Sequence, residues 1–174
     1  MTHSAIGRTV LVSVAALIAS SCNNEMASIA DSGTAPVSDL PAYFNCIDAA
    51  GVSLISAHRG GPSPGYPENA LPTFKRTTSL TGALLEVDVT TSADGVLFLH
   101  HDDTLDRTTT GSGLATETSW EKLRTYSLKD PNRRVTAYGL TRLDEALDWA
   151  RGKAILQLDI KRGTDLDDVA RIDS

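Results

Sequence analysis

The residues best equipped for chemistry in this chain are two histidines, an arginine and several carboxylates, spread over about 45 positions. They occur in three short segments, His58-Arg59-Gly60, Glu86-Val87-Asp88 and His101-Asp102, each at the end of an apolar run. Carboxylate oxygens bind hard divalent cations, arginine binds phosphate, and histidine transfers protons near neutral pH. The combination predicts metal-assisted hydrolysis of a phosphate ester.

Glu86 and Asp88 are two positions apart in a run that predicts a buried strand, so their side chains point to the same side. Two like-charged carboxylates side by side in such a strand are costly unless a cation compensates them. We therefore expect Glu86 and Asp88 to bind a divalent metal ion. The alternative is the solvent face of an edge strand, which the apolar residues around both carboxylates disfavour.

A later segment repeats this alternation. The polar residues Gln157, Asp159 and Lys161 alternate with apolar residues in a run that predicts another strand. Asp159 could add a third metal oxygen, and Lys161 could add positive charge for a phosphate. An ordinary amphipathic strand has the same pattern, so the two interpretations stay open at this point.

Histidine and arginine follow two of the predicted strands. Arg59 enters a loop rich in Gly and Pro, where its guanidinium group would suit a phosphate. Of the neighbours His100 and His101, we expect His101 to face the site, because Asp102 follows it and the loop begins there. His58 and His101 then form the predicted pair of general acid and general base.

Apolar runs, capping residues and turn signals predict the elements that must position these groups. Asn69 is the expected N-cap of a helix, and two capping boxes are expected, one from Thr118 to Glu121 and one from Thr141 to Asp144. Strands that alternate with helices predict an α/β protein with a parallel sheet. The expected strands are residues 52–57, 83–90, 96–100 and 153–161, and the expected helices are residues 40–50, 70–80, around 120–123 and 141–151.

The first 21 residues have the architecture of a secretory signal peptide. Arg8 precedes an apolar run, residues 9–19, that is too short to be a stable membrane anchor, and small residues then lead to Cys22. This ending is similar to a bacterial lipobox. It predicts an acylated Cys22, a lipid anchor, and export to the periplasm or cell envelope of a bacterium. Plain secretion with cleavage near Ala30 is the alternative.

The expected organisation is a signal peptide over residues 1–21, a flexible tether over 22–39 and one domain over 40–174. A lipidated Cys22 would leave Cys46 without a partner, because the chain has two cysteines; a disulfide between them is the alternative. The 174-residue chain has a formal net charge of −6 and no basic stripe, which argues against a nucleic-acid partner.

Taken together, the motifs resemble the glycerophosphodiester phosphodiesterase family in order and spacing over about residues 53–161. Asp159-Ile160-Lys161 occupies the place of the family's usual Glu-Ile-Lys, so the third carboxylate is one methylene shorter here. The other matching segments are His58-Arg59-Gly60, Pro67-Glu68-Asn69, Glu86-Val87-Asp88, Asp94-Gly95, His101-Asp102 and Leu105-Asp106-Arg107-Thr108-Thr109.

The resemblance implies a TIM (β/α)8 barrel with its site at the carboxyl ends of the strands. Glu86, Asp88 and Asp159 would then hold Ca²⁺ or Mg²⁺, with Glu68 as a further carboxylate at or behind them. The implied roles of the other residues are acid and base for His58 and His101, phosphate binding for Arg59 and Lys161, and positioning of the loop for Asp102, Asp106 and Arg107.

The implied reaction hydrolyses a glycerophosphodiester to an alcohol and sn-glycerol 3-phosphate, with a glycerol hydroxyl as internal nucleophile and a cyclic phosphate as intermediate. A TIM barrel needs ~250 residues, so we expect this chain to hold about the first half of the barrel and to be inactive alone. Two alternatives are a non-catalytic surface lipoprotein that binds phosphate headgroups and a related phosphodiesterase of the phospholipase type.

Overall fold

The computed structural model describes residues 40–161 together with residues 164, 167 and 169. The chain divides into two compact units, residues 1–53 and 54–174. The predicted signal peptide, tether and lipidated Cys22 lie outside the described residues. No helix within the described residues has the length and apolar character needed to cross a membrane.

The described part of the first unit is helix α2 (Leu40–Ala49), as predicted. Tyr43, Cys46 and Ile47 are its buried residues, at helical spacing. Gly51 follows with a φ of 63°, which lets the chain leave the helix without strain. Cys46 is disulfide-bonded, so the expectation that it stays unpaired was wrong.

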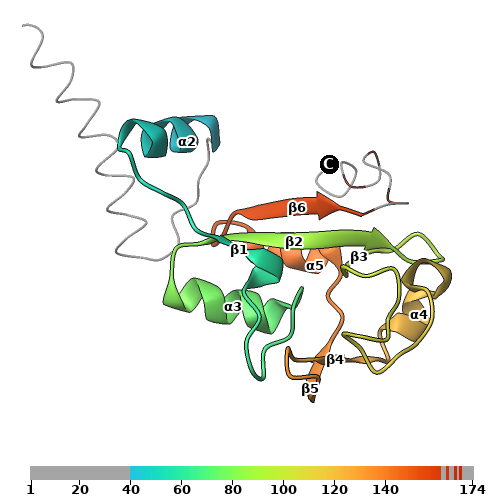
Figure 1. Ribbon diagram of the computed structural model, residues 1–174. Helices are drawn as coiled ribbons and strands as arrows, with labels where there is room; N and C mark the ends of the chain where they lie inside the picture. The colour runs from blue at the N-terminus through green and yellow to red at the C-terminus, as the bar shows by residue number, and fades with distance from the viewer. Residues whose placement is uncertain (1–39, 162–163, 165–166, 168, 170–174) are drawn as a thin grey trace, which may run out of the picture. The chain divides into compact units, whose positions relative to one another are not determined.

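The second unit is built on a four-stranded sheet of β1 (Ser56–Ala57), β2 (Leu84–Thr91), β3 (Leu97–Leu99) and β6 (Leu156–Ile160) (Figure 1). Strands β1 and β6 run parallel to β2, and β3 returns antiparallel along its end. The register places Asp88 of β2 beside Asp159 of β6. The parallel strands therefore bring their carboxyl ends to one edge of the sheet.

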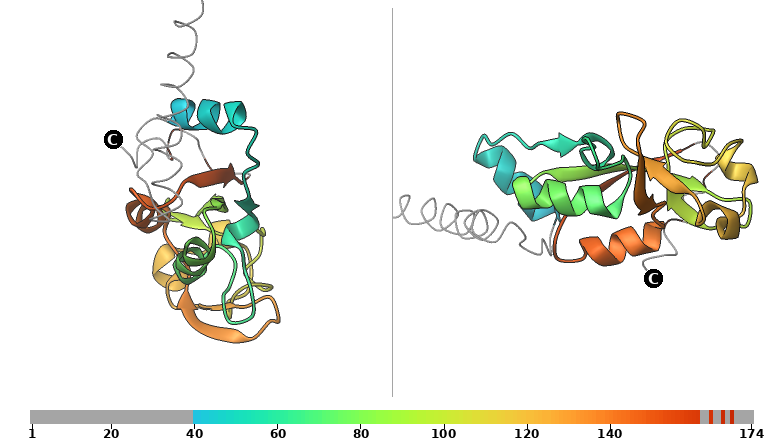
Figure 2. Two further views of the ribbon diagram at one scale, coloured as in Figure 1. Left: turned by 90° about the vertical axis from the view of Figure 1, so that its left-hand side faces the viewer. Right: turned by 90° about the horizontal axis from the view of Figure 1, so that it is seen from below.

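The two faces of β2 have different surroundings. Its Leu85, Val87 and Val89 are fully buried against helices α3 (Leu71–Leu80) and α5 (Leu143–Ala150), which pack on the same face of the sheet (Figure 2). Phe74 of α3 is the largest fully buried side chain described in this core. The alternation of the strand then forces Glu86 and Asp88 to the opposite face, away from the helices.

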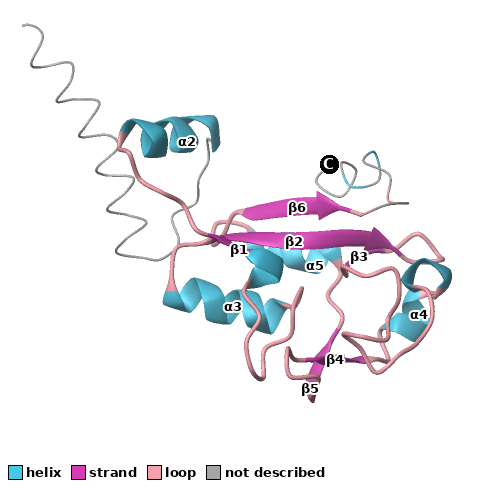
Figure 3. Cartoon of the chain, viewed as in Figure 1, coloured by secondary structure: helices cyan, strands magenta, loops and turns pink. Residues whose placement is uncertain are grey.

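The segment between β3 and α5 packs with Ala70 and Phe98 into a second, smaller core. Figure 3 shows this segment as short elements joined by loops. It contains the short helices η2 (Ala115–Glu117) and α4 (Trp120–Leu123) and a two-stranded sheet of β4 (Ser127–Lys129) and β5 (Val135–Gly139). Neither of these strands is among those expected from the sequence. The turn between them is held by the Asp130 carboxylate, which accepts backbone hydrogen bonds from Asn132 and Arg134.

All three predicted helix caps were wrong. Ala70, not Asn69, is the N-cap of α3, because Asn69 has a left-handed φ of 55° and its side chain bonds elsewhere. The backbone N–H of Trp120 in α4 donates to the carboxylate of Asp94, in the turn between β2 and β3. Asp94 is therefore the acceptor in place of Thr118. The Thr141 hydroxyl accepts a hydrogen bond from the N–H of Leu71 and does not cap α5.

Candidate active site

Three carboxylates meet at the edge where β2 and β6 end. Glu86, Asp88 and Asp159 each present an oxygen, and these oxygens lie within 4.8 Å of one another. Asp88 is 1% exposed, Glu86 is half-buried and Asp159 is exposed. The geometry unites the three carboxylates that the sequence analysis singled out, because the strand register places Asp159 directly beside Asp88.

Two cationic side chains compensate the charge of these carboxylates. Lys161 Nζ lies 2.7 Å from Asp88 Oδ1 and 2.6 Å from Asp159 Oδ2. Arg59 Nε lies 3.7 Å from Asp88 Oδ2. Burial opposes the charged ammonium of Lys161, but the two carboxylates outweigh this effect and raise its pKa. The hydrogen bond from Lys161 likewise lowers the pKa of Asp159.

Asn69 holds Asp88 from the other side. Its Nδ2 donates to Asp88 Oδ2 at 2.7 Å, and its Oδ1 accepts the backbone N–H of Asp88 at 3.0 Å. These reciprocal bonds fix both the carboxylate and the strand at this point. Sequence reasoning missed this role because Asn before a helix suggests a cap. The position of Asn69 beside Glu68, in a motif that the chain shares with the family it resembles, was the available sign of a role in the site.

The loop after β1 depends on glycine. Arg59 has a φ of 53°, and Gly60 and Gly61 follow with φ values of 80° and 81°. A Cβ on Gly60 would lie 2.2 Å from the buried ring of Phe74. This tight path points the backbone N–H of Arg59 at Glu86 Oε2, 2.7 Å away, and so ties the loop to the carboxylate cluster.

A second charged group links the two histidine loops. Arg107 donates to both oxygens of Asp102, at 2.5 and 2.9 Å, and to both oxygens of Glu68, at 2.9 and 2.7 Å. Glu68 also accepts from Arg59 Nη1 at 2.9 Å, and Asp102 contacts His101 Nδ1 at 2.7 Å. We call the residues Arg107, Asp102 and Glu68 the clamp, because they connect Arg59 with His101.

The clamp keeps its carboxylates ionised. The hydrogen bonds and charge of Arg107 hold the pKa of Asp102 far below its ordinary value of 3.8. Burial disfavours ionised Glu68, but the guanidinium groups of Arg107 and Arg59 together lower its pKa below 4.5. Glu68 is thus a partner of arginines in this structure and is not among the three converging carboxylates.

The neighbouring histidines have different environments. His100 is buried, its Nε2 lies 3.0 Å from the carbonyl oxygen of Thr104, and burial lowers its pKa. His101 is partly exposed and lines a pocket with Lys161. His58 is exposed at the start of helix η1 (His58–Gly60), and its ring forms no hydrogen bond or ion pair with a described residue.

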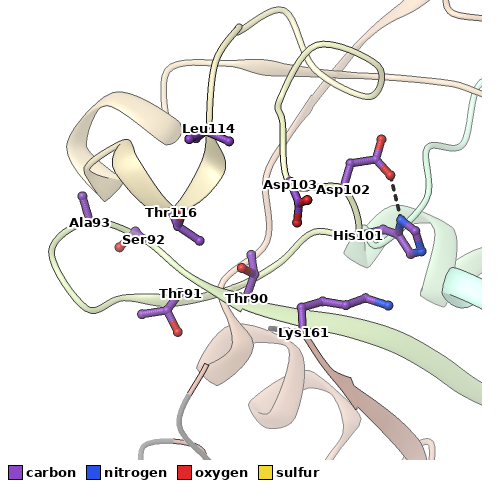
Figure 4. A pocket seen from close by; sticks show the side chains of 10 residues that line it. All are labelled: Thr90, Thr91, Ser92, Ala93, His101, Asp102, Asp103, Leu114, Thr116 and Lys161. Atoms are coloured by element: carbon purple, nitrogen blue, oxygen red, sulfur yellow. Dashed lines mark hydrogen bonds and ion pairs between the residues drawn. The ribbon is translucent and has the colours of Figure 1, made fainter. Parts of the chain in front are cut away.

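A pocket of about 380 Å³ opens beside the cluster, between the end of β2, the loop after β3 and η2 (Figure 4). His101, Lys161 and the neighbouring Thr90 line one part of it, and the side chains of His101 and Lys161 extend in the same direction. Ser92 and Thr116 line another part. The pocket thus places a candidate proton-transfer group and a cation next to polar space.

The cluster suits a hard divalent cation. All three ligand atoms are carboxylate oxygens, the type of donor that Ca²⁺ and Mg²⁺ prefer. Asp88 Oδ1 is buried, and the Lys161 ammonium contacts it from 2.7 Å, so one lone pair of this oxygen is left for a metal ion. A buried carboxylate oxygen with an unused acceptor site is available to a metal ion.

Comparison with known proteins agrees with this geometry. Residues 58–167 match the family model described as "Glycerophosphoryl diester phosphodiesterase family". A glycerophosphodiester phosphodiesterase of Caldanaerobacter subterraneus is 40% identical over 72 residues, which cover 41% of this chain and 29% of that protein. The family match includes every candidate residue from His58 to Lys161.

Solved structures support the same assignment. A glycerophosphoryl diester phosphodiesterase from Parabacteroides distasonis superimposes with a TM-score of 0.66 and 46% identity, covering 68% of this chain and 41% of that one. A phosphodiesterase from Oleispira antarctica, solved with the product sn-glycerol-3-phosphate, gives a TM-score of 0.55 and 27% identity, covering 65% and 46% of the two chains.

The solved relatives are TIM-barrel enzymes, and the present structure covers part of that fold, as predicted. The aligned region spans less than half the length of these relatives. Over that region the chain has the first parallel strands, their helices and the carboxylate cluster at the strand ends. The chain belongs to the glycerophosphoryl diester phosphodiesterase family.

Proposed function

We propose that this protein is a metal-dependent hydrolase that splits glycerophosphodiesters into an alcohol and sn-glycerol 3-phosphate. The observation that carries the proposal is the meeting of Glu86, Asp88 and Asp159 within 4.8 Å, next to Lys161. Carboxylates that share a site with phosphate-binding cations suit metal-assisted phosphoryl chemistry. The family membership of the chain supports the same reaction class.

The three carboxylates would hold Ca²⁺ or Mg²⁺. A bound divalent ion acts as a Lewis acid on a phosphate oxygen and orients the substrate. Arg59 and Lys161 would bind the remaining phosphate oxygens. Both cations already lie beside Asp88, so they can reach a phosphate at the cluster with small side-chain movements.

The histidines would transfer the protons. The contact between Asp102 and His101 Nδ1 favours the tautomer with hydrogen on Nδ1, which leaves Nε2 as the atom that exchanges protons. The glycerol hydroxyl would lose its proton to one histidine and attack phosphorus. The other, His58 or His101, would protonate the departing alcohol oxygen as its bond to phosphorus breaks. Water then opens the cyclic phosphate to glycerol 3-phosphate.

The test is release of glycerol 3-phosphate from glycerophosphoglycerol by the full-length protein, followed with a coupled dehydrogenase. EDTA should abolish the activity, and Ca²⁺ or Mg²⁺ should restore it. His101→Ala should lower kcat by roughly 10²–10⁴-fold, the usual contribution of a general acid or base. Glu117→Gln, at an exposed position outside the pocket, is the matched control and should keep full activity. Turnover that persists in EDTA would refute the role of the metal.

We also propose export of the protein, with residues 1–21 as signal peptide. The basic residue and the short apolar run that lead to the small residues support this proposal. Acylation of Cys22 is not part of the proposal, because the chain has two cysteines and Cys46 is disulfide-bonded. Fusion of residues 1–39 to alkaline phosphatase should give an exported, active enzyme in a bacterium, and deletion of residues 1–21 should abolish this activity. Equal activity of both fusions would contradict export by this segment.

A further inference from the structure

The pocket beside the carboxylate cluster has two chemically different ends. Lys161 and His101 form the end next to the cluster. Farther from the cluster, the side chain of Thr116 and the carboxylate of Asp103 line the wall, whereas Thr90 lies beside Lys161. The two ends come from different elements, so a ligand that touches both must extend from the sheet toward helix η2.

Asp103 differs from the acid before it. Asp102 turns to His101 and belongs to the clamp, whereas the Asp103 carboxylate points into the pocket (Figure 4). The Asp103 carboxylate forms no hydrogen bond or ion pair with any residue in the described part of the chain. This position therefore offers an unneutralised negative charge to a ligand, a short way from a cationic end suited to phosphate.

We propose that this pocket binds the alcohol part of the substrate and selects small alcohols that carry a primary ammonium group. The inference rests on the proposed function. The phosphate would lie at Lys161 and His101, and the ammonium group would lie at Asp103. Ethanolamine esters are the simplest substrates with this arrangement of charges.

Three observations favour a primary ammonium over other groups. The cavity of about 380 Å³ lies at the small end of ligand pockets, and its lining holds just two aliphatic side chains, so it suits a short polar alcohol. None of the described lining residues is Trp, Tyr or Phe, and quaternary ammonium groups are typically bound by such rings. A primary ammonium has three N–H donors, which match the Asp103 carboxylate and the nearby hydroxyls.

The test compares kcat/KM of the full-length protein for glycerophosphoethanolamine, glycerophosphocholine and glycerophosphoglycerol. Wild type should prefer the ethanolamine ester over the neutral glycerol ester by roughly three- to tenfold, the range for one partly solvated ion pair. Asp103→Asn should reduce this ratio to about one, because kcat/KM should fall more for the ethanolamine ester than for glycerophosphoglycerol. The preference of wild type should also shrink at high ionic strength.

Glu117→Gln is the matched control, because it removes one negative charge from the adjacent η2 without touching the pocket lining. It should keep the wild-type preference. The same preference in wild type and Asp103→Asn would overturn the proposal, and so would equal rates for all three substrates in wild type. A preference for the choline ester would contradict the argument from the missing aromatic residues.

A binding experiment separates this inference from the proposed function. Phosphoethanolamine should shift the amide resonances of Asp103 and Thr116 together with those near Lys161, and inorganic phosphate should shift those near Lys161 alone. Asp103→Asn should lower the affinity for phosphoethanolamine to that for inorganic phosphate. If these binding results are obtained but no substrate is hydrolysed, the catalytic proposal is refuted and the ammonium site stands. Identical shifts with both ligands would refute the ammonium site.

Discussion

Replacing Arg107 by methionine should destabilise the domain and reduce catalysis together, because Arg107 connects the loops of both histidines. The substitution removes four hydrogen bonds to two carboxylates that are 15% (Glu68) and 23% (Asp102) exposed. Breaking a fully buried ion pair costs about 3–5 kcal/mol, and breaking an exposed one about 0–1 kcal/mol. For this half-buried group we expect a loss of about 2 kcal/mol at pH 7.

The pH dependence of this loss follows from the lowered pKa values of Asp102 and Glu68. Their folded pKa values lie below the ordinary values of 3.8 and 4.5, so the clamp stabilises the fold fully above those values. Its contribution declines as the pH falls below them toward the folded pKa values, because the unfolded chain then binds protons that the folded carboxylates do not. The difference in unfolding free energy between wild type and Arg107→Met should therefore shrink steadily below about pH 4.5.

Urea unfolding followed by circular dichroism at pH 7 and pH 3.5 measures both effects. Arg124→Met is the matched control, because the pair of Arg124 with Glu121 is exposed and should contribute less than about 0.5 kcal/mol. Arg107→Lys should recover part of the loss, since lysine keeps the charge but cannot bridge two carboxylates with a planar fork. An unchanged stability of Arg107→Met at pH 7, or an equal loss at both pH values, would refute this reasoning.

The kinetic readout distinguishes positioning from general stability. Without Arg107, Asp102 loses the partner that fixes it against His101 Nδ1, so kcat should fall by more than KM rises. Added guanidinium ion should restore part of the kcat of Arg107→Ala, because it can occupy the vacated position. A loss that follows the folded fraction alone and resists guanidinium would assign Arg107 a purely structural role.

Gly60→Ala should cost about 2–4 kcal/mol in a thermal or urea melt, because its new Cβ would clash with Phe74 and the residue has a positive φ. Gly113→Ala also has a positive φ but meets open space, so it should cost less. His100 has a pKa below its ordinary 6.5, so the unfolded chain binds the proton first; stability should fall by up to about 1.4 kcal/mol per pH unit below 6.5, and His100→Gln should flatten that slope. Lys161→Gln should bind Ca²⁺ roughly tenfold more tightly in calorimetry, because a competing cation leaves Asp88, while phosphate binding weakens. The first argument would be contradicted by an unchanged melt of Gly60→Ala, and the second by an unchanged pH dependence of stability in His100→Gln. A weaker Ca²⁺ affinity of Lys161→Gln would contradict the third.

The carboxylate cluster could be predicted from sequence because strand geometry is local. A period of two places Glu86 and Asp88 on one side of β2 and the valines between and after them on the other, whatever the rest of the chain does. Asp159 was a candidate for a third metal oxygen, although an ordinary amphipathic strand has the same pattern. The structure places Asp88 beside Asp159 in the register.

The connections between loops could not be predicted in the same way. Arg107 and Glu68 are 39 positions apart, and no periodicity links a guanidinium group to a carboxylate across that distance. The rules for helix N-caps also gave wrong predictions where a polar side chain forms its hydrogen bonds with a residue far away in the sequence. Asn69 and Thr141 both stand before helices, yet Asn69 bonds to Asp88, and Thr141 accepts from Leu71. The short strands β4 and β5 carry too few apolar positions for their alternation to be recognised.

Asp88 shows why the site and the fold of this domain are difficult to separate. The side chain of Asn69 forms hydrogen bonds with both the carboxylate and the backbone N–H of Asp88. The backbone carbonyl oxygen of Asp88 accepts the N–H of His100. Lys161 contacts the remaining carboxylate oxygen of Asp88. The chain segments that supply the phosphate and proton-transfer groups therefore all converge on one buried strand position. A displacement of Asp88 would move the proposed metal site and the loop of His101 together, so variants here should change metal affinity, stability and kcat jointly.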